Sequence, residues 1–214
     1  MKHLLKLLNP SLLLPIVSLL LVSASCKKDD PTPPTPHNDE EVITTFQFKI
    51  TDSASNATTT YFFKDPDGDG GQSPFYGPTA STQSDSVLQL QNNRTYFVQV
   101  ILMDETKSPA TITSDEVNAE GQDHMLFYNN GSNTIVSASN PYTVKLNGSD
   151  MIIKYTDLDS GSPQRGIGLT TRWRTYTTGK YPLNITLRHQ PGVKDGTYAP
   201  GDSDISVNFK YQIN

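Results

Sequence analysis

Alternation of apolar and polar residues is the feature of this sequence that most constrains its fold. Between Val42 and Asn214 the apolar residues return again and again with a period of two. Successive side chains of a strand point to opposite faces, so each such segment predicts a strand with one buried and one solvated face. The clearest segments are Phe46–Ile50, Tyr142–Leu146, Leu183–Leu187 and Ile205–Phe209, and Arg94–Met103, apolar in both phases, predicts a central strand.

Only one segment predicts a helix. Thr113 to Glu116 fits a capping box, and Gly121 is a natural stop for the helix that would follow. Parallel strands need long crossover connections, which are usually helical, and the rest of the domain offers none. The sequence therefore predicts an all-β fold, an antiparallel, immunoglobulin-like β-sandwich with one short helix.

The first part of the chain has the layout of a bacterial export signal. Lys2 and Lys6 precede an apolar run from Leu12 to Val22, and small residues stand directly before Cys26. This pattern predicts cleavage before Cys26 by the lipoprotein signal peptidase and acylation of that cysteine. The expected organisation is a signal peptide at 1–25, an acylated cysteine with a flexible Pro-rich linker at 26–41, and a single domain at 42–214.

A transmembrane anchor is the alternative interpretation of the same segment. Asn9 and Pro10 interrupt it and leave too short an apolar stretch to span a bilayer, so the lipid anchor is favoured. Cys26 is also the only cysteine. Its acylation excludes a disulfide, a catalytic cysteine and a cysteine-based zinc site from the mature protein.

Charge and motifs exclude two broad classes of function. The chain has a formal net charge of −5, which provides no general electrostatic footprint for nucleic acid. It contains no Gly-x-Ser-x-Gly elbow, phosphate-binding loop, dinucleotide fingerprint or His-Glu-x-x-His motif. We therefore expect a protein that is not an enzyme.

Several segments together resemble a family of small lipoproteins of Bacteroidota. In chain order they read FFKDPDGDGGQSP, HMLFY, YTDLDSG, GIGL, LRHQPGVKDG and DISVNFKY. Members often carry the automatic label of a type 1 periplasmic binding fold, which needs alternating strands and helices and conflicts with the pattern above. The resemblance implies a role in nutrient capture beside a TonB-dependent receptor. It also implies that the acidic residues after Cys26 direct the protein to the outer membrane, facing the cell surface.

One set of side chains predicts a transition-metal site. It consists of Glu116, Glu120, Asp123, His124 and His189. Glutamates four residues apart share one face of a helix, and imidazole with carboxylate suits Zn²⁺ or Cu²⁺. The alternative is a solvated acidic helix with one histidine bound to a backbone carbonyl.

A second set predicts a calcium loop. Asp65, Asp67 and Asp69 alternate and are followed by glycines, so their oxygens converge when the loop curls. The loop lacks the glutamate of an EF-hand, and a solvated turn is the alternative. Weaker versions, for which a turn is favoured, occur at Asp157–Gly161 and Asp202–Asp204.

An aromatic group suggests a different ligand. Trp173, Tyr176 and Tyr181 with the flanking arginines would form a sugar-stacking platform. Trp173 is also in phase with Ile167 and Leu169, which favours a core position for it instead.

Two sites match a short O-glycosylation pattern of this phylum, an aspartate followed by Ser or Thr and a small aliphatic residue. They are Ser53, in a predicted loop, and Ser86, at the start of a predicted strand. Taken together, the sequence predicts a surface lipoprotein that captures a metal or other nutrient. A glycan-binding or structural adhesion module is the alternative.

Overall fold

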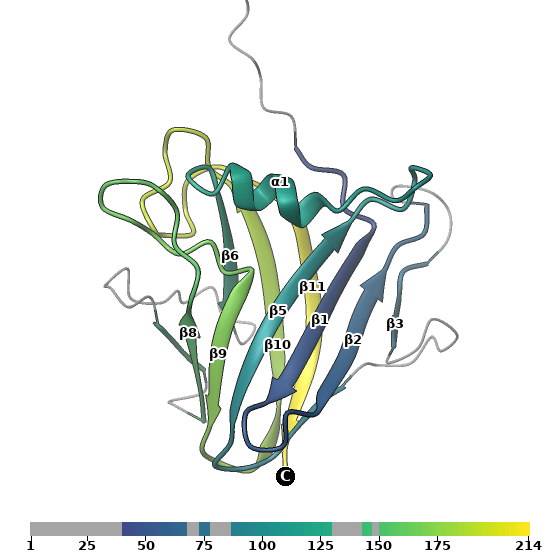
Figure 1. Cartoon of the computed structure of the whole chain (residues 1–214), viewed down its shortest axis with the longest axis vertical. Coiled ribbons are helices and arrows are strands. Elements are labelled where there is room, and N and C mark those ends of the chain that lie inside the picture. The colour runs from purple at the N-terminus through teal and green to yellow at the C-terminus, as the bar shows by residue number, and fades with distance from the viewer. Residues whose placement is uncertain (1–39, 68–72, 78–86, 130–142, 147–149) are drawn as a thin grey trace, which may run out of the picture. The chain divides into compact units, whose positions relative to one another are not determined.

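The computed structural model describes residues 40–67, 73–77, 87–129, 143–146 and 150–214 (Figure 1). The predicted signal peptide, Cys26, most of the predicted linker, Asp69 and Ser86 lie outside the described residues. Within these ranges no helix is both long and apolar enough to cross a membrane.

The strands form two sheets that pack face to face. The larger sheet has the order β3 (Phe75–Gly77), β2 (Thr58–Lys64), β1 (Thr45–Asp52), β5 (Thr95–Met103), β9 (Thr170–Thr175), β8 (Met151–Tyr155) and β7 (Thr143–Leu146). The smaller sheet has the order β4 (Val87–Leu90), β11 (Asp202–Ile213), β10 (Gly179–His189) and β6 (His124–Asn129), and runs behind β5 and β1 in Figure 1. The predicted sandwich is confirmed, and all neighbouring strands are antiparallel except β4 and β11, which pair in parallel.

The core lies between the sheets, where the inward phases of the alternating segments meet. Phe48 of β1 packs edge-on against Phe209 of β11, with ring centroids 5.2 Å apart, and against Trp173 of β9 at 5.7 Å. Burial of each large apolar side chain stabilises the fold by roughly 1.5–3 kcal/mol. Trp173 is fully buried, so its predicted core position is confirmed and its role in a sugar-stacking platform is wrong.

β5 occupies the middle of the larger sheet, as its apolar sequence predicts. Its two faces differ, however. Val98 and Val100 are buried in the core, whereas Phe97 points outward and is 54% exposed. The apolar residues in the second phase of β5 therefore belong to an open sheet face.

The only helix in the described residues is α1 (Thr113–Ala119), which crosses the end of the sandwich at which β5 ends (Figure 1). Val117 anchors it in the core. The predicted capping box is wrong, because the cap residue is Ile112, which has no side-chain cap bond, and Thr113 is already helical. The helix ends before Gly121, where a Cβ atom would lie 2.6 Å from Cδ1 of Ile167, so close packing favours glycine.

Candidate metal centre

Two histidines stand opposite each other on neighbouring strands. His124 is the first residue of β6 and His189 the last of β10, and they are register partners. Their rings stack nearly parallel, with centroids 4.6 Å apart and an interplanar angle of 6°. Both belong to the inward phase that buries Leu126 and Leu187, so the rings enter the interior at the end of the sandwich.

Glu41 completes a set of three ligand groups. Its Oε2 lies 2.9 Å from Nε2 of His124, and its side chain is only 4% exposed. Three ligand atoms lie within 4.8 Å of one another, one each from Glu41, His124 and His189. The sequence predicts a flexible linker that ends with Glu41. This end of the linker is wrong, because the Glu41 side chain is buried in the domain. The residue that precedes β1 by four positions is part of the domain interior.

Asp204 reaches the same place because of a β-bulge. In the β10–β11 pair Leu187 faces Ile205 and Arg188 faces Ser203, so Asp204 is the extra residue. A bulge redirects a side chain that regular alternation would point outward. The Asp204 side chain is fully buried, and its Oδ2 lies 3.7 Å from Nε2 of His124. Neither of its oxygens has a hydrogen bond of ordinary geometry among the described residues.

The other ring nitrogen of His124 is held by the backbone. Nδ1 lies 3.3 Å from the carbonyl oxygen of Glu120, to which it donates. This contact directs Nε2 towards Glu41 and Asp204. A backbone or carboxylate partner on the second nitrogen is typical of histidines that bind metals, because it fixes the orientation of the ring.

The charges in this cluster are strongly interdependent. Burial alone lowers the pKa of His124, but the hydrogen bond and the charge of Glu41 outweigh it and raise that pKa above its usual value. Burial opposes ionisation of Glu41 as well, yet contact with His124 holds the pKa of Glu41 below its usual value. Burial and the negative charge of Glu41 raise the pKa of Asp204 to about 7. The hydrogen bond between Nε2 of His124 and Oε2 of Glu41 occupies the place where a cation would bind both atoms.

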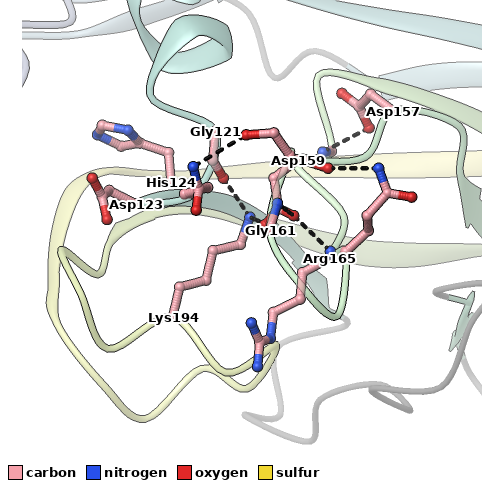
Figure 2. A network of polar contacts seen from close by, with 12 residues as sticks. Gly121, Asp123, His124, Asp157, Asp159, Gly161, Arg165 and Lys194 are labelled. Carbon is pink, nitrogen blue, oxygen red and sulfur yellow. Dashed lines mark hydrogen bonds and ion pairs between the residues drawn. The ribbon is translucent and has the colours of Figure 1, made fainter.

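A second network fixes the backbone on both sides of the histidines (Figure 2). Lys194 donates to the carbonyl oxygen of Gly121 at 2.6 Å and to Oδ2 of Asp159 at 2.9 Å. The backbone N–H of Gln190, next to His189, donates to the carbonyl oxygen of Asp123, next to His124, at 2.6 Å. The His124 ring points away from the Lys194–Asp159 pair in Figure 2, so this network positions the site and does not enter it.

The structure brings only some of the predicted ligands together. His124 and His189 converge as predicted. Glu116 is exposed on α1 and Asp123 accepts the N–H of Gly192, and neither belongs to the group of converging ligand atoms. Glu120 contacts His124 through its carbonyl oxygen, not through its carboxylate.

The predicted turn at Asp157–Gly161 is confirmed. Oδ1 of Asp159 accepts the backbone N–H groups of Gly161 and Arg165, at 3.0 and 2.9 Å. The carboxylate of Asp157 accepts those of Gly168 and Thr170. These aspartates are therefore occupied in holding the loop.

The other predicted sites are only partly described. Asp65 and Asp67 follow β2 and are half-buried, and with Asp69 outside the described residues the calcium loop stays a prediction. Ser53 is exposed in the turn after β1, where Asp52 accepts the N–H of Ala54. Tyr176 is 43% exposed, and half-buried Tyr181 donates to Thr178.

No protein-family model, curated protein or solved structure matches this chain. The chemistry of the cluster is therefore the main guide to what it binds. It offers two imidazoles and two carboxylates in a buried space, a donor set that suits Zn²⁺ or Cu²⁺.

Proposed function

We propose that this domain binds a divalent transition metal ion, Zn²⁺ or Cu²⁺, through Glu41, His124 and His189, with Asp204 as a fourth ligand. The observation that carries this proposal is the convergence of three ligand atoms within 4.8 Å in the interior. Four-coordinate binding by nitrogen and oxygen is the common arrangement for zinc.

The free-energy cost of burying two carboxylates supports a cation at this position. Glu41 and Asp204 place two carboxylates beside each other with side chains at most 4% exposed. Burial of charge is expensive unless it is compensated, and His124 provides only one compensating group. A dication would neutralise both carboxylates while it binds the imidazole nitrogens.

The donor set also favours some metals over others. Imidazole suits zinc, copper and nickel, whereas calcium and magnesium prefer sets made only of oxygen ligands. His124 and His189 therefore favour a transition metal at this centre. The separate Asp65–Asp69 loop remains the candidate for calcium.

The wider role follows from the sequence. The export signal and Cys26 support a lipid-anchored outer-membrane protein, and the Bacteroidota resemblance supports a place beside a TonB-dependent receptor. In that setting the domain is a non-enzymatic binding protein that captures a metal and passes it on. Glu41, four residues before β1, contributes its carboxylate to the centre from the start of the domain.

Calorimetry of the metal-free, full-length protein with Zn²⁺, Cu²⁺ and Ca²⁺ tests metal binding. We expect binding of zinc or copper at one site, with loss of binding in His124→Ala and in His189→Ala. His37→Ala is the matched control, because His37 precedes the predicted domain at 42–214 in the sequence and is not one of the proposed ligands. Circular dichroism of each variant separates loss of a ligand from loss of the fold.

Two outcomes contradict the proposal. One is the absence of heat with zinc and copper while the protein is folded. The other is equal binding by the wild type and by a folded His124→Ala/His189→Ala double variant.

A further inference from the structure

The outer face of the larger sheet carries a row of cations on an otherwise acidic protein. Five cationic side chains occupy its outward positions between β1 and β7. They are Lys49 on β1, Arg172 and Arg174 on β9, Lys154 on β8 and Lys145 on β7. The outward positions of these strands and of β5 hold no Asp or Glu. The charge of this face is thus opposite in sign to the net charge of the chain, which is −5.

No carboxylate in the described part of the chain forms an ion pair with these cations. Among the described residues, the ion pairs of lysine and arginine are those of Lys64, Lys107 and Lys194, and none of the five cations of the row takes part in them. Lys64 shares the outward phase of the larger sheet but lies on β2, beyond the row, where it pairs with Glu105. Arg172 and Lys154 are even register partners, side by side on β9 and β8. Like charges directly opposite each other destabilise a sheet, so this arrangement has a cost that an anionic ligand would remove.

Aromatic and hydroxyl groups lie among the cations. Phe97 is 54% exposed and pairs with Arg172, and Tyr176 is 43% exposed with the guanidinium of Arg174 5.7 Å from its ring centre. Thr95 accepts a hydrogen bond of 3.3 Å from Arg174. Aromatic faces pack on apolar ring faces, and hydroxyl groups exchange hydrogen bonds with other hydroxyls.

The face is also hollowed in two places. One hollow of about 430 Å³ lies over β1, β5 and β9 and includes Lys49, Phe97 and Thr170. A second of about 350 Å³ lies over β5, β9 and β8 and includes Lys154, Arg172 and Tyr176. From β1 to β7 the row crosses five strands, a distance of about 19 Å at the usual strand spacing. An extended chain therefore has room to lie across the strands.

We propose that this face binds an acidic polysaccharide, whose carboxylate or sulfate groups contact Arg172, Arg174 and Lys154 and whose sugar rings pack against Phe97 and Tyr176. Arginine binds carboxylate and sulfate groups through two parallel hydrogen bonds, which gives geometric selectivity as well as charge. Threonines along the hollows supply hydrogen bonds for sugar hydroxyls.

A lipid surface is less well matched to this face. Peripheral membrane binding needs a sizeable apolar area for insertion in addition to basic residues. Here the exposed large apolar groups are Phe97, on β5, and Tyr176, directly after β9, and each has polar neighbours. The proposal does not depend on the metal centre, which lies at the end of the sandwich and not on this face.

The test measures binding of the full-length protein to polygalacturonate, dextran sulfate and uncharged dextran. We expect binding to one or both acidic polymers and not to dextran, weakened by added NaCl because salt screens exposed charges. The two acidic polymers distinguish a preference for carboxylate from one for sulfate. Arg172→Gln/Arg174→Gln should weaken binding by about tenfold or more.

The control variants remove similar cationic or apolar side chains that lie outside this face. Lys107→Gln/Lys180→Gln deletes two exposed cations away from this face and should leave the affinity within about threefold of the wild type. Phe97→Ala should weaken binding, whereas Val193→Ala, which removes a similarly exposed apolar group in a loop, should not. His124→Ala should retain polysaccharide binding, which separates this proposal from that of the metal centre.

Three results would overturn the proposal. The first is equal binding of dextran and the acidic polymers. The second is the same loss in the Lys107/Lys180 control as in the arginine variant. The third is arginine-dependent binding to phosphatidylglycerol vesicles without binding to either acidic polymer, which would assign the face to a membrane.

Discussion

Lys194 and Asp159 form an ion pair with 2.9 Å between Nζ and Oδ2, and both side chains are only 2% exposed. The pair joins the loop before β9 to the loop before β11, and Lys194 also binds the carbonyl oxygen of Gly121 (Figure 2). Gly121 lies three residues before His124. The ion pair therefore ties two loops to the backbone that positions the candidate metal centre.

Removal of one partner of this pair should destabilise the domain strongly. Lys194→Met leaves the Asp159 charge buried without its partner, and we expect a loss of about 3 kcal/mol in the free energy of unfolding. Lys194→Met/Asp159→Leu leaves no isolated charge and should recover much of that loss. Thermal and urea unfolding measure both variants, and equal destabilisation by the single and double variants would contradict the expectation.

Asp204→Asn should have opposite effects on stability and on metal binding. The pKa of Asp204 is raised to about 7 in the folded protein, from an ordinary value of 3.8, by burial and by Glu41. Between these two values the unfolded chain binds fewer protons than the folded one, so the contribution of this group to stability falls as the pH rises. Asparagine cannot ionise, so the variant lacks this penalty. At pH 8 we expect its free energy of unfolding to exceed that of the wild type by on the order of 2 kcal/mol, a value that allows for the lost attraction to His124.

Unfolding of the metal-free protein at pH 4 and pH 8 measures that effect. The gain of Asp204→Asn over the wild type should be large at pH 8 and small at pH 4. Zinc affinity should fall by about tenfold or more in the same variant, as expected when a supporting carboxylate is lost. A variant that is less stable than the wild type at pH 8 would contradict the assignment of Asp204 as a costly buried acid.

Most of the fold could be predicted from sequence because the signal is local. Alternation in Phe46–Ile50 and Leu183–Leu187 already identifies which side of each strand is buried, and Trp173 follows the same phase. The parallel pairing of β4 with β11 could not be predicted, since it joins segments far apart in the chain. The start of α1 was misplaced by one residue, because Thr113 fits the cap position of a capping box but is the first helical residue, after the cap Ile112.

The candidate metal centre was only half predictable. His124 and His189 were identified because each stands at one end of a predicted strand, and their pairing follows from the register of β6 and β10. Glu41 follows a Pro-rich polar stretch, and no periodicity distinguishes a buried glutamate there from a solvated one. Asp204 depends on a bulge, which is a property of the pairing of two strands and not of either strand alone.

Cys26→Ser tests the anchor. Without the thiol there is no acylation, so the variant should appear in the soluble fraction or accumulate as the precursor, whereas the wild type fractionates with the outer membrane. Protease added to intact cells should cleave the wild-type domain if it faces outward. Protection on intact cells together with cleavage after lysis would favour the inner face of the outer membrane.

Ser53 should carry the O-linked glycan in the turn between β1 and β2. The turn is exposed, and Asp52 accepts backbone N–H groups there, so the three-residue pattern lies on an accessible loop. Ser53→Ala should lower the intact mass by more than the change of side chain accounts for. Ser55→Ala, in the same turn but outside the pattern, is the matched control, and an unmodified wild-type mass would remove the idea.

Metal affinity should fall as the pH falls. Nε2 of His124 must lose its proton to bind a metal, and contact with Glu41 raises the pKa of His124, so protons compete with the ion near neutral pH. We expect zinc affinity to decrease by about tenfold for each pH unit below neutrality for every proton released. Calorimetry at pH 8, 7 and 6, in two buffers with different enthalpies of ionisation, gives the number of protons. Asp204→Asn should release fewer protons near pH 7 than the wild type, and an affinity independent of pH in both proteins would place the metal away from His124.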